Sequence, residues 1–283
     1  MTNRPQLVTA LAPLRQLLEP RRRQGQRIGL VPTMGALHEG HLSLVRAAKA
    51  ECDFAVVSIF VNPSQFGPDE DFAKYPRMLD ADLSLLATCG TDLVFAPEAA
   101  EVYRPGHAAW VEVGGVAEPL EGCCRPGHFR GVATIVLKLL NMVQPHAAYF
   151  GQKDYQQLRV IQQMVEDLDV PVEIRPCPIV REPDGLAMSS RNAYLSPEAR
   201  QRALVLSRSL ARAKELVAEG ERRAAVIADE MRQIILTAAD ARIDYVALVD
   251  PRTLQAVEEL RGATLAALAV RIENTRLIDN TVL

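Results

Sequence analysis

Two histidines three residues apart are the first candidates for chemistry in this sequence. His38 and His41 end the stretch PTMGALHEGH, which follows a short apolar run at residues 28–31 and precedes a helical pattern over about 41–52. A helix N-terminus presents backbone N–H groups that have no partner within the helix and that carry a partial positive charge. A strand, a glycine-containing turn and a helix start therefore predict a phosphate site here. At such a site both imidazoles would donate hydrogen bonds to a phosphoryl group that gains charge during attack.

Several known motifs do not fit this stretch. Zinc proteases need His-Glu-x-x-His, with two ligands four residues apart, so the spacing of His38 and His41 argues against zinc. A P-loop needs Lys and then Ser or Thr after its second glycine, but His41 and Leu42 follow Gly40, and no Gly-x-Gly-x-x-Gly follows a strand. A capped helix whose two histidines are merely exposed stays open as an alternative at this point.

The length and composition indicate a globular protein. A length of 283 residues, at ~150 residues per domain, suggests two domains. The net charge of −3 gives no electrostatic reason to expect nucleic acid, and the Arg21–Arg23 run is most simply a solvated loop. No apolar run approaches the ~20 residues of a membrane span, and the first residues lack a signal-peptide core. Five cysteines without a Cys-x-x-Cys pair are interpreted as reduced thiols, so we expect a cytoplasmic protein with no nucleic-acid or membrane partner.

The first two thirds of the chain alternate between strand-like and helical patterns. Residues 54–61 are apolar except at Ser58 and rich in β-branched side chains, which is typical of a strand buried on both faces of a parallel sheet. Asn62 and Gln65 follow this run, so they lie just beyond the carboxyl end of a strand, where open α/β sheets bind ligands. Further strands are expected at 93–96, 147–150 and 172–174, and helices at 7–18, ending near Pro20, and at 79–89. These patterns predict an α/β fold, a Rossmann-like parallel sheet with helices on both faces.

The stretch RPGHFRG at 125–131 precedes an apolar helix predicted over 132–143. His128 and Arg130 would lie before the start of that helix. They would either meet an anionic ligand or cap and solvate the turn, and this pattern alone favours the second interpretation.

The turn Gly151-Gln-Lys-Asp154 repeats the opening arrangement, because it follows a strand and opens a helix. Lys153 is a natural counter-charge for a polyphosphate, and Gln157 is a neutral donor and acceptor aimed at the same crevice. A charged helix start without a ligand is the alternative.

The loop around residues 178–192 contains two hydroxyls and a guanidinium in succession, Ser189, Ser190 and Arg191. Such a cluster can hold phosphate oxygens by several hydrogen bonds at once. Beyond it, Ser196-Pro197 marks a helix start, and helices at 197–218 and 222–238 precede strand-like runs at 244–249 and 264–270. We therefore expect a Rossmann-like nucleotide-binding domain over 1–182 and a smaller C-terminal α+β domain over 183–283 that closes over the active site.

Taken together, six ordered stretches closely resemble the pantothenate synthetase (pantoate–β-alanine ligase) family, within the superfamily of adenylyl-transferring enzymes with a His-x-Gly-His signature. The stretches are PTMGALHEGH, FVNPSQF, RPGHFRGVATIVLKL, YFGQKDYQQL, DGLAMSSRN and TRLIDN, and they run through nearly the whole chain. The resemblance implies joining of (R)-pantoate to β-alanine at the expense of ATP, through a pantoyl-adenylate, with release of pyrophosphate and then AMP. It also implies Mg dependence, a cytoplasmic location and a homodimer.

The resemblance also implies roles for individual residues. His41 would be the catalytic proton donor, with His38 beside it, and Lys153 and Arg191 would also be catalytic. Gln65, Gln157 and Asn62 would hold pantoate, with Gln65 also near β-alanine. The residues that would bind ATP are Pro32, Thr33, Met34, Gly35, Ala36, Leu37, His38, Glu39, Gly40, His41, Gly151, Gln152, Lys153, Asp154, Val180, Met188, Ser189, Ser190 and Arg191. The Mg ligands are unknown, with Asp80 and Asp82 as guesses.

The residue types suit this chemistry. The pantoate carboxylate is ionised at neutral pH, so it needs no general base, and the difficulty is the approach of an anion to a polyanion. Histidine, lysine and arginine side chains on the phosphates relieve that repulsion, whereas neutral Gln65 and Gln157 suit the hydroxy-acid. A nucleotidyltransferase of the same superfamily that acts on a phosphorylated acceptor is the alternative, and it would want basic groups in the acceptor pocket. A nucleotide-binding module without catalysis and a tRNA-linked synthetase fit less well.

Overall fold

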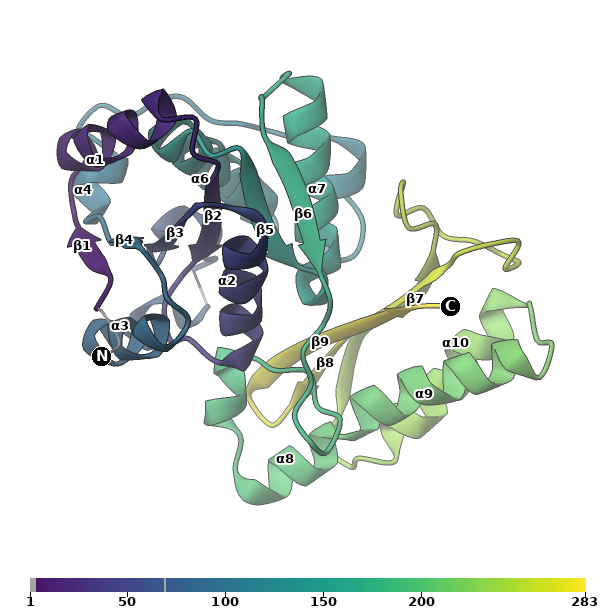
Figure 1. Cartoon of the computed structure of the whole chain (residues 1–283). Helices are drawn as coiled ribbons and strands as arrows, with labels where there is room; N and C mark the ends of the chain where they lie inside the picture. Colours follow the sequence, from purple (N-terminus) through teal and green to yellow (C-terminus); the bar gives the residue numbers. More distant parts are fainter. Residues whose placement is uncertain (1–3, 69) are drawn as a thin grey trace. The chain divides into compact units, whose positions relative to one another are not determined.

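The computed structural model describes residues 4–68 and 70–283, which divide into two compact units (Figure 1). The first unit has a six-stranded parallel sheet with helices on both faces, and the second is an α+β unit with a three-stranded antiparallel sheet. Both match the predicted fold class. The first unit comprises Met1–Gly114, Arg125–Gln152 and Gln157–Pro178, and the second comprises Gly115–Cys124, Lys153–Gln156 and Ile179–Leu283.

The sheet of the first unit reverses its strand order at its centre. Its strands, in spatial order, are β1 (Gln6–Val8), β4 (Leu93–Phe95), β3 (Phe54–Ile59), β2 (Ile28–Thr33), β5 (Ala147–Gly151) and β6 (Glu173–Cys177). From β2 the chain continues through β3 and β4 on one side, whereas β5 and β6 lie on the other. The carboxyl ends of β2 and β5 therefore border the switch point at which open α/β sheets bind their ligands.

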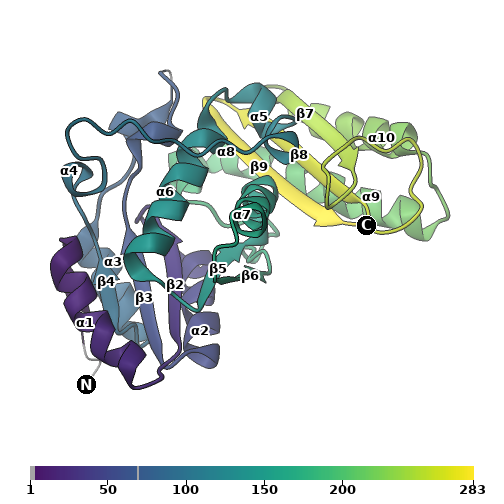
Figure 2. The ribbon, with the colours of Figure 1, turned by 90° about the horizontal axis from the view of Figure 1, so that it is seen from above.

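Helices cover both faces of this sheet (Figure 2). On one face lie α2 (Glu39–Glu51) and α3 (Leu79–Thr88), and on the other lie α1 (Leu11–Arg23), α6 (His128–Val143) and α7 (Tyr155–Asp167). This double covering explains why β2 and β3 are continuous apolar runs. Shorter elements complete the unit: the helix α4 (Ala99–Val102) and the 3₁₀ turns η1 (Pro63–Gln65) and η2 (Asp71–Ala73).

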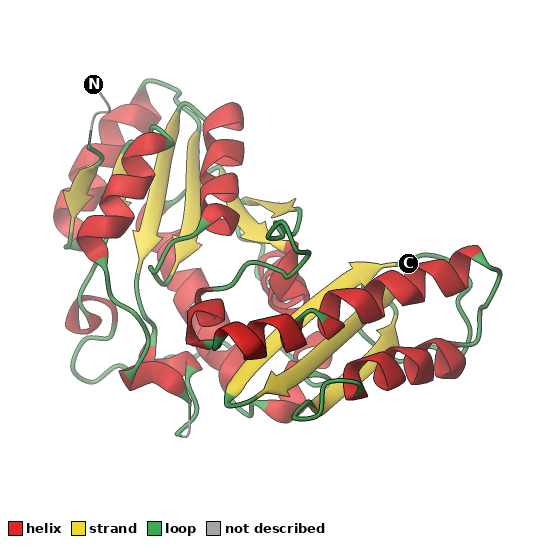
Figure 3. Cartoon of the chain, turned by 90° about the horizontal axis from the view of Figure 1, so that it is seen from below, coloured by secondary structure: helices red, strands yellow, loops and turns green. Residues whose placement is uncertain are grey.

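The second unit packs helices against a small antiparallel sheet (Figure 3). Its strands β7 (Arg242–Val249), β8 (Leu265–Ile272) and β9 (Thr275–Val282) pair in that order. Its helices are α8 (Pro197–Ala203), α9 (Val205–Ala218) and α10 (Ala224–Leu236), with the short helix α5 (Glu121–Cys124). The 3₁₀ turns η3 (Gly115–Ala117) and η5 (Ser190–Tyr194) also belong to the second unit. The 3₁₀ turn η4 (Gln152–Asp154) has its first residue in the first unit and its other two in the second.

The N-terminal prediction was wrong in two ways. Leu7 and Val8, expected in a helix, form strand β1 because they pair in parallel with β4, a contact that local periodicity does not reveal. Helix α1 also continues through Pro20 to Arg23, and the Gln24 N–H donates to the Pro20 carbonyl. The three arginines therefore lie in the last helical turn, where positive charge complements the helix dipole.

Three other boundaries differ from expectation. Helix α6 begins at His128 rather than after Gly131, with Gly127 in the left-handed region before it. The single helix expected over 197–218 is broken at Leu204 into α8 and α9. The TRLIDN stretch forms a third antiparallel strand, β9. None of the helices in the described residues is long and apolar enough to cross a membrane.

Candidate active site

The loop after β2 is held in shape by a buried carboxylate from helix α3. Asp82, 1 % exposed, accepts hydrogen bonds from the backbone N–H of Ala36 at 3.0 Å and of Leu37 at 2.8 Å. Gly35 and Ala36 both have positive φ, and a side chain at Gly35 would approach Asp82 Oδ2 to 3.0 Å and Ile59 to 3.1 Å. Burial raises the pKa of the Asp82 carboxyl, although the two amide bonds oppose this shift. Asp82 therefore supports the loop.

The two histidines cap helix α2 with one ring nitrogen each. His38 Nδ1 accepts from the Gly40 N–H at 3.1 Å, and His41 Nδ1 accepts from the His38 N–H at 3.3 Å. A nitrogen that accepts carries no proton, so each neutral ring has its proton on Nε2. The ring centroids lie 4.1 Å apart, and both side chains are partly exposed. The cap therefore places the ring proton of each neutral histidine on Nε2.

This geometry corrects one step of the sequence argument. We expected the amides at the start of α2 to be available to a phosphate, but the Gly40 N–H is bonded to His38 Nδ1 and the His41 N–H to the His38 carbonyl at 2.8 Å. The Ala36 and Leu37 amides are bonded to Asp82. The alternative of a capped helix was therefore correct in that the histidines cap α2. The cap also determines that Nε2, and not Nδ1, carries the proton in each neutral ring.

Gln65 lies beside the histidine loop with a fixed side chain. Its Oε1 accepts from Asn62 Nδ2 at 3.1 Å, and its Nε2 points to Met34 Sδ at 3.2 Å. Asn62 is 1 % exposed, and it also donates to the Gly131 carbonyl at 3.2 Å and accepts from the Tyr103 hydroxyl at 2.8 Å. Asn62, expected to touch pantoate, is thus buried and serves to orient Gln65.

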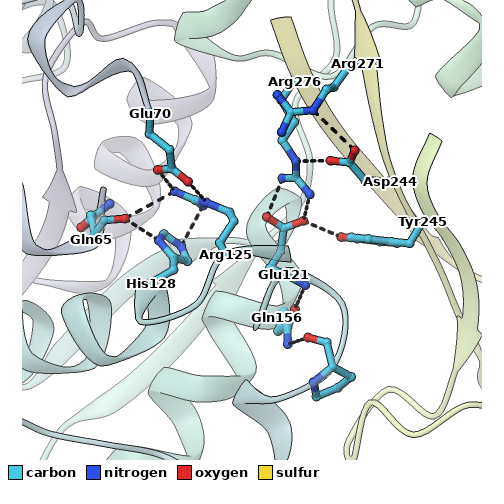
Figure 4. A network of polar contacts seen from close by, with 11 residues as sticks. Gln65, Glu70, Glu121, Arg125, His128, Gln156, Asp244, Tyr245, Arg271 and Arg276 are labelled. Atoms are coloured by element: carbon cyan, nitrogen blue, oxygen red, sulfur yellow. Dashed lines mark hydrogen bonds and ion pairs between the residues drawn. The ribbon is translucent and has the colours of Figure 1, made fainter. Parts of the chain in front are cut away.

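A second group holds Gln65 through its backbone (Figure 4). His128 Nδ1 donates to the Gln65 carbonyl at 2.8 Å, and Arg125 forms a bidentate pair with Glu70, with both distances 2.6 Å. Arg125 also approaches His128 Nε2 at 3.0 Å. Burial alone would raise the pKa of Glu70, but the hydrogen bonds and charge of Arg125 outweigh it and the pKa is lowered. His128 is buried, so the expectation of a solvated turn was wrong for it, whereas Arg130 lies over the exposed Trp110 ring.

In the second unit, Lys153 lies in the turn η4 with its backbone anchored. The Lys153 carbonyl accepts from Asn280 Nδ2 at 2.8 Å. Three residues on, Gln156 donates to the Pro119 carbonyl at 2.6 Å and accepts from the Glu121 N–H at 3.0 Å (Figure 4). It also donates to the Val116 carbonyl at 2.9 Å. Within residues 4–68 and 70–283 the Lys153 ammonium forms no ion pair, so its charge is available to an anion.

The loop that carries the remaining expected ATP residues is a tight hairpin. The Met188 N–H donates to the Val180 carbonyl at 3.0 Å, so these two residues lie side by side. Ser189 caps η5 by accepting from the Arg191 N–H at 3.3 Å. Arg181, at the bridge to Ala187, pairs with Asp279 at 2.7 and 2.9 Å. The hairpin is therefore a fixed part of the second unit.

Comparison with known proteins agrees with this geometry. The model of the pantoate-beta-alanine ligase family matches residues 6–282. The chain belongs to this family. It is 55 % identical to the pantothenate synthetase of Moorella thermoacetica over 98 % of both chains. Its structure is similar to that of pantothenate synthetase from Thermus thermophilus, with a TM-score of 0.93, 47 % identity and 98 % of each chain covered. The pantoate-beta-alanine ligase of Francisella tularensis, complexed with beta-gamma ATP and beta-alanine, has a TM-score of 0.80 at 34 % identity, covering 98 % of this chain and 97 % of that one.

The residues expected from the pantoate-beta-alanine ligase motifs divide between the two units. Residues 32–41, with Asn62, Gln65, Gly151, Gln152 and Gln157, belong to the first, and Lys153, Asp154, Val180 and residues 188–191 belong to the second. Gln157 is partly exposed and makes no side-chain hydrogen bond within the described residues. Of the expected ATP residues, Glu39 pairs with Arg46 on the surface of α2.

The structure also bears on the two guessed Mg ligands. Asp80 is exposed and pairs with Arg4 at 2.6 Å, and both oxygens of Asp82 accept backbone N–H groups. Among the residues described, no three His, Cys, Asp or Glu side chains form a group that could hold a metal ion. Mg²⁺ is often held by substrate phosphates with few protein ligands, so this finding leaves the expected Mg dependence as a prediction.

Sequence reasoning missed the residues that support the site. Asp82 was considered only as a possible Mg ligand. An acidic residue beside Leu83 and Leu86 on the buried face of α3 could have indicated a buried carboxylate that needs hydrogen-bond partners. Tyr103 and Glu70 carry no comparable signal, because their partners lie 41 and 55 residues away in the chain.

Proposed function

We propose that this chain is a pantoate–β-alanine ligase that forms pantothenate in two steps. In the first, the pantoate carboxylate attacks the α-phosphorus of ATP, the bond to the β-phosphate breaks, and pyrophosphate leaves. In the second, the β-alanine amine attacks the acyl carbon of the pantoyl-adenylate, a C–N bond forms, and AMP leaves. Activation is needed because a carboxylate has no leaving group of its own.

The histidine pair suits the first step. Charge grows on the phosphoryl oxygens in the transition state, and removing one well-placed donor to such a charge typically costs about 3 kcal/mol. His38 and His41 present Nε2–H donors because their Nδ1 atoms are engaged in the helix cap. Lys153 and Arg191 add positive charge, and we assign both to the ATP phosphates. We write Mg²⁺ as part of the substrate, MgATP, and route no step through a protein-bound ion.

One observation carries the choice of acceptor: the neutral amide of Gln65 is held by Asn62 and lies against Met34 of the histidine loop. The neighbouring Arg125 is paired with Glu70, so the charge of this arginine is compensated. A hydroxy-acid with one carboxylate fits such a site, whereas a phosphorylated acceptor would call for basic groups. Gln157 provides a second neutral amide, and we assign both glutamines to pantoate and Gln65 also to β-alanine.

Two further properties belong to the proposal. All five cysteines lack disulfide partners, which supports a reducing compartment, and we place the enzyme in the cytoplasm. Membership of the family supports a homodimer, which sedimentation at several concentrations would test.

The experiment that tests the function is pyrophosphate and AMP release from MgATP with pantoate, with and without excess β-alanine. The expected result is pantoate-dependent pyrophosphate, with sustained AMP release only when β-alanine is present. Pyrophosphate with a phosphorylated acceptor and none with pantoate would assign the chain to the nucleotidyltransferases. ATP binding without cleavage would make it a binding module.

A further inference from the structure

The TRLIDN stretch contacts two segments that carry expected ATP residues, but none of its own residues is among those expected to bind a substrate. It forms β9, an edge strand that pairs only with β8 in its sheet. Two consecutive polar residues of this strand, Asp279 and Asn280, are buried, at 2 % and 4 % exposed. Strand residues normally alternate between two faces, and buried polar groups need partners. The two residues must therefore be engaged by other segments of the chain.

Both partners are segments that carry expected ATP residues. Asp279 forms a bidentate pair with Arg181, at 2.7 and 2.9 Å, and Arg181 also donates to the Gly185 carbonyl at 3.1 Å. This pair fixes the hairpin in which Val180 meets Met188. Asn280 donates from Nδ2 to the Lys153 carbonyl at 2.8 Å.

The two contacts are coupled at the strand. The Asn280 N–H donates to Asp279 Oδ1 at 2.8 Å, and Arg181 reaches the Asn280 carbonyl at 3.4 Å. One short piece of β9 thus holds the Lys153 backbone and the hairpin at once. All of these residues belong to the second unit, so the contacts lie within one compact body.

We propose that Asn280 is a positioning residue for ATP: its side-chain amide holds the Lys153 backbone so that the ammonium meets the phosphates. The proposal rests on the proposed function, because it takes Lys153 to bind the phosphates of ATP. A lysine side chain is long and flexible, and it directs its charge reproducibly only when its backbone is fixed. Asn280 itself touches no substrate in this account.

The test compares Asn280→Ala and the isosteric Asn280→Asp, which keeps the size of the side chain but removes the donor, with Lys153→Ala. Thr275→Val is the matched control, since it changes another buried polar residue of the same strand at constant size. Thermal melts of all variants monitor folding. The readouts are the Kd of MgATP, the Kd of adenosine, which lacks phosphates, and the rate of pyrophosphate formation.

Both Asn280 variants should weaken MgATP binding about 10-fold and leave adenosine binding unchanged, and Lys153→Ala should do the same. Pyrophosphate formation should fall 10- to 100-fold, the size expected when a group is misplaced by about 1 Å. Asn280→Ala combined with Lys153→Ala should be no worse than Lys153→Ala alone, because both changes remove one effect.

Equal weakening of MgATP and adenosine would overturn the proposal, because β9 would then have only a structural role. Fully additive losses in the double variant would overturn it as well. The two binding constants do not require pantoate, so they test the role of Asn280 even if the wild-type chain releases no pyrophosphate with pantoate. That last result would refute the proposed function alone.

Discussion

Gly131 is the position at which the smallest change should most affect the acceptor side of the site. It lies in the first turns of α6, against the turn η1 that carries Gln65. A Cβ added there would lie 2.3 Å from the Ser64 carbonyl oxygen and 2.8 Å from the Gln65 Cα, whereas real Cβ contacts essentially never fall below 3.0 Å. Because the obstructing atoms are backbone, Gly131→Ala must move η1 or α6 by at least 0.7 Å, the difference between 2.3 and 3.0 Å.

The displacement should reach Gln65 directly. Asn62 Nδ2 donates both to the Gly131 carbonyl and to Gln65 Oε1, so the amide that orients Gln65 is tied to the residue that is changed. A shift approaching 1 Å in a positioned group costs up to ~10²-fold in rate. We expect kcat/KM for pantoate to fall 10- to 100-fold and the KM of ATP to change little.

The fold should survive this change. Overpacking typically costs about 1 to 3 kcal/mol, and alanine in place of a helical glycine recovers up to about 1 kcal/mol. Asn141→Ala, an exposed change on the same helix, is the matched control. The assay is initial-rate pyrophosphate release as pantoate and ATP are varied in turn, with thermal melts alongside. A folded Gly131→Ala enzyme with the wild-type pantoate KM and kcat would refute the reasoning, as would an equal rise in both KM values.

Three further predictions test other parts of the site. His41→Ala should slow adenylate formation by about 10² or more in a single-turnover assay with little change in the ATP Kd, because its donor matters most in the transition state, and unchanged turnover would exclude that role. Gln157→Ala should raise the pantoate KM far more than the ATP KM, and equal effects would mean that Gln157 only supports its helix. Glu70→Gln should destabilise the fold at pH 7 and have progressively less effect as the pH is lowered through the folded-state pKa of Glu70, measured by urea unfolding. The pKa of Glu70 is lowered in the folded state by its pairing with Arg125. This pairing therefore stabilises the fold fully above the unfolded-state pKa, and the stabilisation is lost as the pH falls through the folded-state pKa. A pH-independent difference between variant and wild type would contradict this linkage.

The sheet of the first unit could be predicted because its central strands have a recognisable local sequence pattern. The strand β3 is apolar at nearly every position, since it is covered on both faces, and that composition is visible without knowing its partners. Strand β1 has only three residues and is defined by its pairing with β4, some 85 residues away, so the same local reasoning took it for part of a helix. Elements set by long-range pairing escape prediction from periodicity.

The residues of the candidate site also fall into two groups, those that local motifs predict and those that long-range contacts define. The side chains proposed to meet ligands lie in short motifs, and the motifs name His38, His41, Lys153 and Gln65 directly. Groups that hold those side chains come from other parts of the chain: Asp82 reaches Ala36 and Leu37 across some 45 residues, and Asn280 reaches Lys153 across 127. A supporting residue needs only one suitable atom at the right place, so its sequence neighbourhood carries little information about its role.

The choice of histidine at both motif positions follows from the helix start. The ordinary caps Ser, Thr, Asp and Asn also satisfy the first backbone N–H groups of a helix, but ionised Asp keeps no donor and the shorter Ser, Thr and Asn side chains carry their donors less far from the backbone than imidazole does. An aspartate cap would also place negative charge beside the phosphates. Neutral imidazole can accept at Nδ1 and donate at Nε2, so His38 and His41 complete the cap of α2 and keep a ring N–H each. The Ala36 and Leu37 amides are engaged by Asp82, and the Gly40 and His41 amides by the cap. In the proposed function, stabilisation of phosphate charge therefore falls to side chains rather than to these four amides.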